Sequence, residues 1–185
     1  MKLNLGACDR RIDGFVSVDI AEPADQIADL AALWPWPDAS VDEVRAHDVI
    51  EHIGDCDHTG TVCSRCFNRD SSAFRTLLSF APQRHPLGRI HFMNELHRVL
   101  KPGARATIET PNASRGAGFF QDPTHKSPWC LNSFQYFEAG SFAHNRLAKT
   151  YGITAAFRVV SLGESSYQDV HEQVWKITAI LEAVK

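Results

Sequence analysis

Short segments of apolar or alternating apolar and polar residues, each ended by glycine or a charged residue, recur along the chain and are typical of β-strands in a partly buried sheet. We predict strands at residues 2–5, 15–20, 41–47 and 104–109. Between the last two, apolar residues at helical spacing predict a helix over 90–100, which the Pro102-Gly103 pair would end. Strands that alternate with helices in this way predict a parallel sheet flanked by helices.

The C-terminal part of the chain adds a different pattern. We predict a second helix somewhere between residues 132 and 151, closed by Gly152, and two late strands at 157–162 and 174–181 that form a hairpin. The predicted fold class is therefore α/β, with a mostly parallel sheet and a C-terminal antiparallel hairpin. Ligands of such sheets bind beyond the carboxyl ends of the strands, so the loops that follow strands are the candidate functional sites.

The composition fits a single globular domain over residues 1–185. A 44% hydrophobic share and a formal charge of −3, from 19 basic and 22 acidic residues, argue against a disordered or fibrous chain. No run of like charges predicts a nonspecific nucleic-acid binder, although arginines between residues 65 and 89 keep a local nucleic-acid contact open. We find neither a signal peptide nor an apolar span of about 18 residues, and we expect a cytoplasmic protein with no membrane segment.

Gly6 and Asp19 follow the first two predicted strands. A glycine at this position lets the backbone approach a ligand closely, and a carboxylate at the end of the next strand can accept hydrogen bonds from two ribose hydroxyls. Each residue also has a structural interpretation, as a turn glycine and as a helix cap. Their spacing within one strand-loop-strand unit favours a nucleoside-binding site.

Longer segments carry a combined pattern: LNLGACDRRIDGFVSVDI, Ala28-Asp29-Leu30, Trp34-Pro35-Trp36-Pro37-Asp38, VDEVRAHDVIEHI and NELHRVLKPGARATIETPN. This ordered set resembles class I S-adenosylmethionine-dependent methyltransferases. The later segment 121–126, QDPTHK, is similar to one in small bacterial and phage methyltransferases of the type 11-like group. The resemblance implies a Rossmann-like fold, S-adenosylmethionine as cofactor, and a small-molecule or nucleoside-type methyl acceptor.

The resemblance also implies roles for individual residues. The cofactor site would comprise Gly6, Ala7, Cys8, Asp19, Asp29, Leu30 and Asp48. The loop that begins at Gly6 would hold the methionine moiety, Asp19 the ribose, and Asp29 with Leu30 the adenine. The family usually has a second glycine where this chain has Cys8, and we expect a cysteine to fit there if its φ is negative. Trp34 and Trp36 either wall the adenine or form a structural turn.

The candidate catalytic residues are Glu51, His52, Asp122 and His125. They follow the fourth and fifth strands of the implied fold, and histidines or carboxylates with a pKa near neutrality can take a proton from an N–H or O–H acceptor. Lys126 could instead neutralise an anionic substrate. The structural alternatives are that Glu51 and His52 cap a turn and that Asp122-Pro123-Thr124-His125 is a turn with no catalytic role.

A cysteine-containing segment at about 54–88 interrupts the pattern and is interpreted as an inserted lid. It holds four candidate ligands for a structural zinc ion: Cys56, His58, Cys63 and Cys66. His52 or His85 could replace His58. The alternatives are a reduced loop in which the cysteines have no joint role and a Cys63-Cys66 redox pair.

These observations leave two classes of function open. The first is an S-adenosylmethionine-dependent methyltransferase, and the second is a noncatalytic S-adenosylmethionine-binding or zinc-organised interaction protein. A nucleotide-dependent oxidoreductase is disfavoured because no Gly-x-Gly-x-x-Gly run follows the first strand. The sequence does not predict the oligomeric state.

Overall fold

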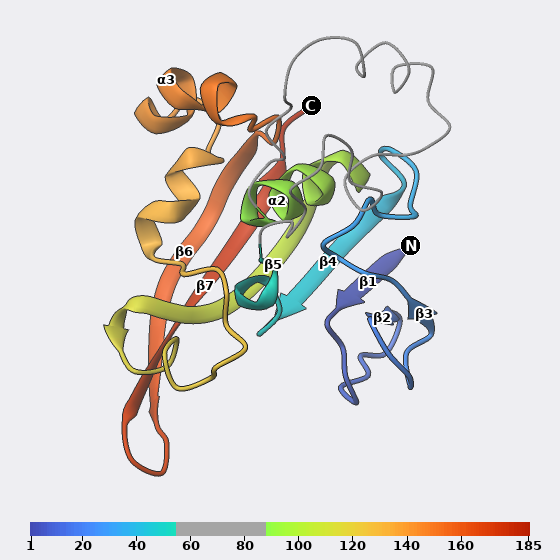
Figure 1. Ribbon diagram of the computed structural model, residues 1–185. Helices are drawn as coiled ribbons and strands as arrows, with labels where there is room; N and C mark the ends of the chain where they lie inside the picture. The colour runs from blue at the N-terminus through green and yellow to red at the C-terminus, as the bar shows by residue number, and fades with distance from the viewer. Residues whose placement is uncertain (55–87) are drawn as a thin grey trace, which may run out of the picture.

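A seven-stranded sheet forms the centre of the protein in a computed structural model that describes residues 1–54 and 88–185 (Figure 1). The strands are β1 (Lys2–Leu5), β2 (Val16–Asp19), β3 (Gln26–Ile27), β4 (Val41–His47), β5 (Leu100–Gly116), β6 (Phe157–Gln168) and β7 (Gln173–Ala183). The helical segments of the described chain are η1 (Ile50–His52), α2 (Gly88–Val99), η2 (Leu131–Tyr136) and α3 (Phe142–Tyr151).

The sheet has the strand order β3-β2-β1-β4-β5-β7-β6. The pairs from β3 to β5 are parallel, whereas β7 runs antiparallel to both of its neighbours, β5 and β6. β1 therefore lies inside the sheet, between β2 and β4. The predicted α/β fold, with a mostly parallel sheet and a C-terminal antiparallel hairpin, is confirmed.

Several predicted boundaries were wrong. Leu100 was placed in the helix 90–100, but α2 ends at Val99 and Leu100 begins β5, where it pairs with Val41 and is fully buried. A buried leucine is compatible with a helix and with a strand, so the spacing of apolar residues alone could not assign Leu100 to either element. Similarly, β5, β6 and β7 are longer than their predicted ranges. By contrast, the second helix, expected somewhere between 132 and 151 and closed by Gly152, is confirmed as α3, which Gly152 ends with φ +73.

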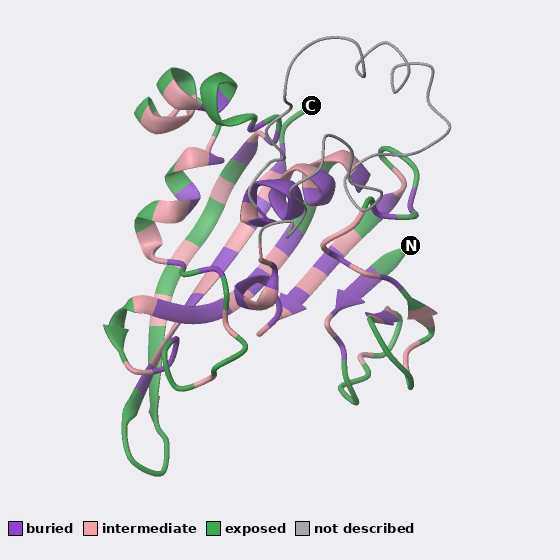
Figure 2. Cartoon of the chain, in the orientation of Figure 1, coloured by how far each residue is buried: buried purple, intermediate pink, exposed green. Residues whose placement is uncertain are grey.

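The hydrophobic core lies between the central strands and α2. Phe92, Met93 and Leu96 of α2 are fully buried in the same cluster as Leu3 and Leu5 of β1. Figure 2 shows buried residues concentrated on β4, β5 and α2, and mostly exposed or intermediate residues along β6. Burying each such side chain contributes about 1.5–3 kcal/mol, so this core fixes the strand ends from which the site loops leave.

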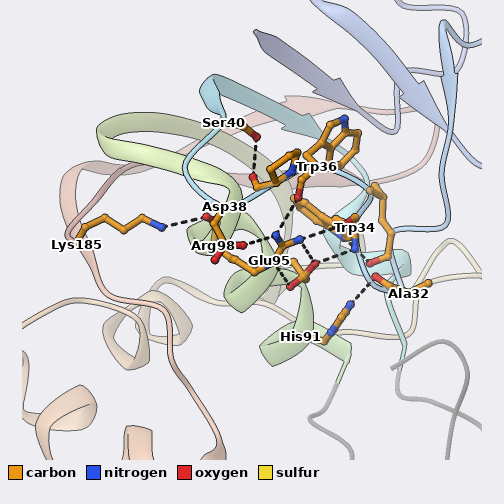
Figure 3. A network of polar contacts seen from close by, with 11 residues as sticks. Ala32, Trp34, Trp36, Asp38, Ser40, His91, Glu95, Arg98 and Lys185 are labelled. Atoms are coloured by element: carbon orange, nitrogen blue, oxygen red, sulfur yellow. Dashed lines mark hydrogen bonds and ion pairs between the residues drawn. The ribbon is translucent and has the colours of Figure 1, made fainter. Parts of the chain in front are cut away.

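Arg98 of α2 connects the helix to residues 34–38 (Figure 3). Its guanidinium donates to both carboxylate oxygens of Glu95, at 2.8 and 2.7 Å, and to the carbonyl oxygens of Trp36 and Trp34, at 2.9 and 3.1 Å. The two indoles are 4% and 2% exposed. Their burial beside α2 favours the structural interpretation of the two tryptophans.

No helix in the described part of the chain is long and apolar enough to cross a membrane.

Candidate functional site

A cavity of about 570 Å³ lies at the carboxyl ends of β1, β2 and β4. Its volume falls in the range of about 300–1,000 Å³ that is typical of small-molecule sites. All of the predicted cofactor residues except Ala7 line it, namely Gly6, Cys8, Asp19, Asp29, Leu30 and Asp48. The structure thus brings together residues that lie up to 42 positions apart in the sequence because parallel strands end at the same edge of the sheet.

Gly6 occupies a position that only glycine fills without strain. Its φ is +62, and a Cβ built there would lie 2.6 Å from Cγ2 of Val49. Val49 itself lines the cavity. The missing side chain therefore permits both the left-handed turn after β1 and the close packing of the β1 loop on the β4 loop.

Cys8 occupies the position at which we expected a cysteine to fit if its φ were negative. The observed φ is +48, in the left-handed region that non-glycine residues rarely adopt. The conformation directs the Cys8 N–H to Oδ2 of Asp19, at 2.8 Å. Ala7 is buried and donates its N–H to Val18 O at 3.1 Å, so it links the loop to β2 and does not line the cavity.

Asp19 holds its carboxylate in place with two backbone hydrogen bonds. Besides the Cys8 N–H at Oδ2, the N–H of Ile20 donates to Oδ1 at 2.7 Å. Each oxygen retains a further lone pair, and the residue lines the cavity. The neighbouring loop is ordered by Asp29, which accepts from the Ala31 N–H at 2.9 Å, and by the Leu30 carbonyl, which accepts from the Trp34 indole at 3.1 Å.

Asp48 brings a second carboxylate to the cavity. Its Oδ2 accepts a hydrogen bond from Lys176 at 2.6 Å, whereas its Oδ1 is buried without a hydrogen-bond partner in the described structure. Lys176 also donates to Glu109 at 3.0 Å. Lys176 lies on β7, 128 positions from Asp48, and no sequence pattern indicated its role. The Asp48 carboxylate thus lines the cavity with one oxygen paired to Lys176 and the other buried without a donor.

The four predicted catalytic residues also meet. Nε2 of His125 lies 3.9 Å from Oε1 of Glu51 and 3.8 Å from Oδ2 of Asp122, and the rings of His52 and His125 have centroids 4.7 Å apart. Because His52 also lines the cavity, the cluster borders the space in which a cofactor would lie. Glu51, His52, Asp122 and His125 are called the polar cluster below.

Burial governs the ionisation of the polar cluster. Glu51 is fully buried, and this burial raises the pKa of its carboxyl to about 7, against a smaller lowering by the hydrogen bond from Thr110. Burial, followed by repulsion from His125, lowers the pKa of His52. Hydrogen bonds from the hydroxyl and the N–H of Thr124 lower the pKa of Asp122. The lowered pKa values favour a neutral His52 and an ionised Asp122, and the raised pKa of Glu51 favours the protonated form of its carboxyl more than in water.

Sequence reasoning missed the two threonines that orient this cluster. Thr110 on β5 donates its hydroxyl to Glu51 Oε2 at 2.9 Å, and Thr124 contacts both His52 and Asp122. Threonine within a strand or a turn is too common for either to stand out. The predicted zinc ligands Cys56, His58, Cys63 and Cys66 lie outside the described residues.

Comparison with known proteins supports the predicted fold. No protein-family model and no curated protein sequence matches this chain. An S-adenosylmethionine-dependent methyltransferase from Methanosarcina mazei aligns with a TM-score of 0.59 and 11% identity over 99% of this chain and 92% of its own. One from Archaeoglobus fulgidus aligns with a TM-score of 0.51 and 15% identity over 98% and 85%.

A third solved structure is that of 1,6-didemethyltoxoflavin-N1-methyltransferase from Burkholderia thailandensis, with 1,6-didemethyltoxoflavin and S-adenosylhomocysteine bound. It aligns with a TM-score of 0.53 and 12% identity over 100% of this chain and 71% of its own. The chain therefore has the Rossmann-like fold of class I S-adenosylmethionine-dependent methyltransferases.

Proposed function

We propose that this protein is an S-adenosylmethionine-dependent methyltransferase that acts on a small molecule or a nucleoside-type acceptor. The observation that carries the proposal is the cavity itself: on this fold, Gly6, Asp19 and Asp48 line a space of suitable volume at the carboxyl ends of β1, β2 and β4. The solved methyltransferase with a small-molecule substrate and S-adenosylhomocysteine supports both the cofactor and the acceptor class.

The cavity residues match the groups of the cofactor. The free lone pairs of the Asp19 carboxylate suit the two ribose hydroxyls, and the negative charge of Asp48, which lines the cavity, suits the ammonium of the methionine moiety. The missing side chain of Gly6 lets the cofactor approach the backbone. Asp29 and Leu30 would border the adenine, on a loop that the Trp34 indole holds.

The polar cluster would face the methyl acceptor. An acceptor lone pair attacks the sulfonium methyl group, the carbon–sulfur bond breaks, its electron pair stays on sulfur, and S-adenosylhomocysteine leaves. Holding the two reactants in line supplies much of the rate enhancement. An N–H or O–H acceptor must also lose a proton, and the polar cluster offers imidazole and carboxylate groups near the cavity to receive it.

We further propose a single domain into which the segment 54–88 is inserted. The support is that the described residues at its two ends adjoin: a Cβ on Gly88 would lie 2.0 Å from the carbonyl oxygen of Gly54. The two ends of the segment thus lie side by side, as the ends of an insertion do.

Replacing Asp19 with alanine is expected to weaken the binding of S-adenosylmethionine and S-adenosylhomocysteine at least tenfold, about 1.4 kcal/mol. The reason is the loss of the charged acceptor for the ribose hydroxyls. The measurement is calorimetric titration with both compounds, and Asp13→Ala is the control because Asp13 is exposed in the same β1–β2 connection, outside the cavity. Unchanged affinity in Asp19→Ala would exclude Asp19 from the site, and no binding by folded wild-type protein would refute the cofactor proposal.

A turnover assay separates the enzyme from a noncatalytic cofactor-binding or interaction protein. A panel of small molecules and nucleosides is incubated with S-adenosylmethionine, and the release of S-adenosylhomocysteine is followed. An enzyme releases it only with a suitable acceptor, whereas an interaction protein binds the cofactor and leaves it intact.

A further inference from the structure

Glu51, His52 and His125 place three metal-ligand groups together at the edge of the cofactor cavity. One ligand atom of each residue lies within 4.8 Å of those of the other two, and the His125 Nε2 to Glu51 Oε1 distance is 3.9 Å. We propose that these three side chains bind one divalent transition-metal ion. Two ligands on a zinc ion at about 2.1 Å lie about 3.4 Å apart at the tetrahedral angle, so side-chain shifts of about 1 Å would complete the site.

The first independent indication is the carboxylate of Glu51. The residue is fully buried, its Oε2 accepts from Thr110, and its Oε1 has no hydrogen-bond partner in the described structure. Leaving a buried carboxylate oxygen without a donor or a cation is costly. Because Oε1 is also the atom nearest to His125 Nε2, it is directed into the group of ligands.

The second indication is the way in which both imidazoles are oriented. Nδ1 of His125 lies 2.7 Å from the carbonyl oxygen of Phe119 and must carry the proton of that hydrogen bond, which leaves a lone pair on Nε2 of the neutral ring. The Thr124 hydroxyl donates its only proton to Asp122 at 2.7 Å, so it accepts from Nδ1 of His52 at 3.1 Å. His52 therefore also keeps its lone pair on Nε2.

Histidine ligands of metal ions are held in this same way, with the other ring N–H donated to a carbonyl or to a carboxylate-linked group. His125 has such a partner in the Phe119 carbonyl, and His52 has one in the Thr124 hydroxyl. The Glu51 carboxylate is held by the hydrogen bond from Thr110. The hydrogen bonds thus leave a lone pair on one atom of each residue, namely Oε1 of Glu51 and Nε2 of each histidine. A cation satisfies all three atoms at once.

Two histidines and one carboxylate suit zinc and iron(II), and they leave coordination positions open. His52 lines the cavity, so an open position would face it. If the proposed methyl transfer holds, an acceptor hydroxyl bound there would release its proton to solvent, because the ligand atoms of Glu51, His52 and His125 would be bound to the metal and would no longer receive it. Its oxygen would form the new O–C bond as the carbon–sulfur bond breaks. The inference therefore names hydroxyl-bearing compounds as the class of methyl acceptor, and this part rests on the proposed function. The metal site itself does not depend on the proposed function.

The test uses cobalt(II) and zinc as probes on the full-length, chelator-treated protein. Cobalt is informative because thiolate ligands give an intense sulfur-to-metal charge-transfer band in the near ultraviolet, whereas imidazole and carboxylate ligands do not. This distinction matters because Cys56, Cys63 and Cys66, outside the described residues, are candidate ligands too. Bound zinc is counted by elemental analysis and its affinity measured by competition with a chromophoric chelator.

We expect wild-type protein to show visible cobalt bands from a site without thiolate ligands. Glu51→Gln and His125→Ala should each lower the zinc count by one ion per chain or weaken the binding of that ion at least tenfold. His144→Ala is the matched control, since His144 is a half-buried histidine bonded to the Ala155 carbonyl at 3.1 Å and lies outside the group. Circular dichroism checks that each variant is folded, and Glu51→Gln keeps the size and the Thr110 contact of the original side chain.

The proposal is overturned if cobalt gives only thiolate-type spectra, or if both variants retain the wild-type zinc count and affinity. Calorimetry with S-adenosylhomocysteine on the same samples reports on the cofactor separately. A protein that binds zinc through Glu51 but not S-adenosylhomocysteine would refute the proposed function and keep the metal site. The opposite result would refute the metal site alone.

Discussion

Replacing Arg98 with methionine is expected to lower the free energy of unfolding by about 3–5 kcal/mol, because it leaves a buried charge without its partner. Glu95 is 6% exposed, and both of its carboxylate oxygens accept from the Arg98 guanidinium. The same guanidinium binds the carbonyl oxygens of Trp34 and Trp36. For a chain of this size the melting temperature should fall by about 10 °C, as measured by differential scanning calorimetry.

Arg105→Met is the matched control. Arg105 forms an ion pair with Glu182 at 3.3 Å, but its side chain is 55% exposed, so its loss should cost less than about 1 kcal/mol. The double variant Arg98→Met/Glu95→Met removes the buried charge of Glu95 together with its partner and should recover part of the loss. If Arg98→Met and Arg105→Met had the same melting temperature, the network in Figure 3 would contribute no more to stability than a surface ion pair.

The lining of the cavity was predictable because its signals are local. Gly6 and Asp48 follow recognisable strands, Asp19 ends one, and the carboxyl ends of neighbouring parallel strands meet at one edge of the sheet. What the sequence could not supply was the backbone conformation. A cysteine was expected to fit at position 8 on the condition of a negative φ, but the observed φ is +48, and the Cys8 N–H donates to Asp19.

The contacts within the polar cluster could not be predicted from the sequence. Glu51 and His125 were predicted as separate catalytic candidates, 74 positions apart, and nothing in the sequence indicated the distance between them. The structure joins them through the backbone, since the Glu51 carbonyl accepts from the N–H groups of both Lys126 and Ser127 at 2.8 Å. Backbone contacts of this kind leave no residue pattern in a single sequence. The same holds for Arg98, whose partners at 34–38 precede it by about 60 positions.

These contacts link the two halves of the proposed site. The β4 loop carries Asp48 and Val49 on the cofactor side and continues into η1, which carries Glu51 and His52 of the polar cluster. A displacement of Val49 would therefore change the cofactor cavity and the acceptor side together. Gly6, which packs against Val49, is the position at which a single added carbon would test this.

Gly6→Ala is expected to weaken the binding of S-adenosylhomocysteine about 100-fold, or about 2.7 kcal/mol. The added Cβ would lie 2.6 Å from Val49 Cγ2 and 2.7 Å from Val49 Cβ, so the β1 and β4 loops must move apart. Calorimetric titration measures the affinity, and a thermal melt confirms that the variant is folded at the temperature used.

The control for Gly6→Ala is Gly14→Ala, in the same β1–β2 connection. Gly14 also has positive φ, +79, but a Cβ there meets no atom within 4 Å. Both variants bear the left-handed penalty of about 1–2 kcal/mol for a residue with a Cβ, whereas only Gly6→Ala adds the collision with Val49. Gly14→Ala should therefore lose stability and keep its cofactor affinity within about twofold of wild type. Equal affinities in the two variants would show that the packing of Gly6 on Val49 does not shape the cofactor site.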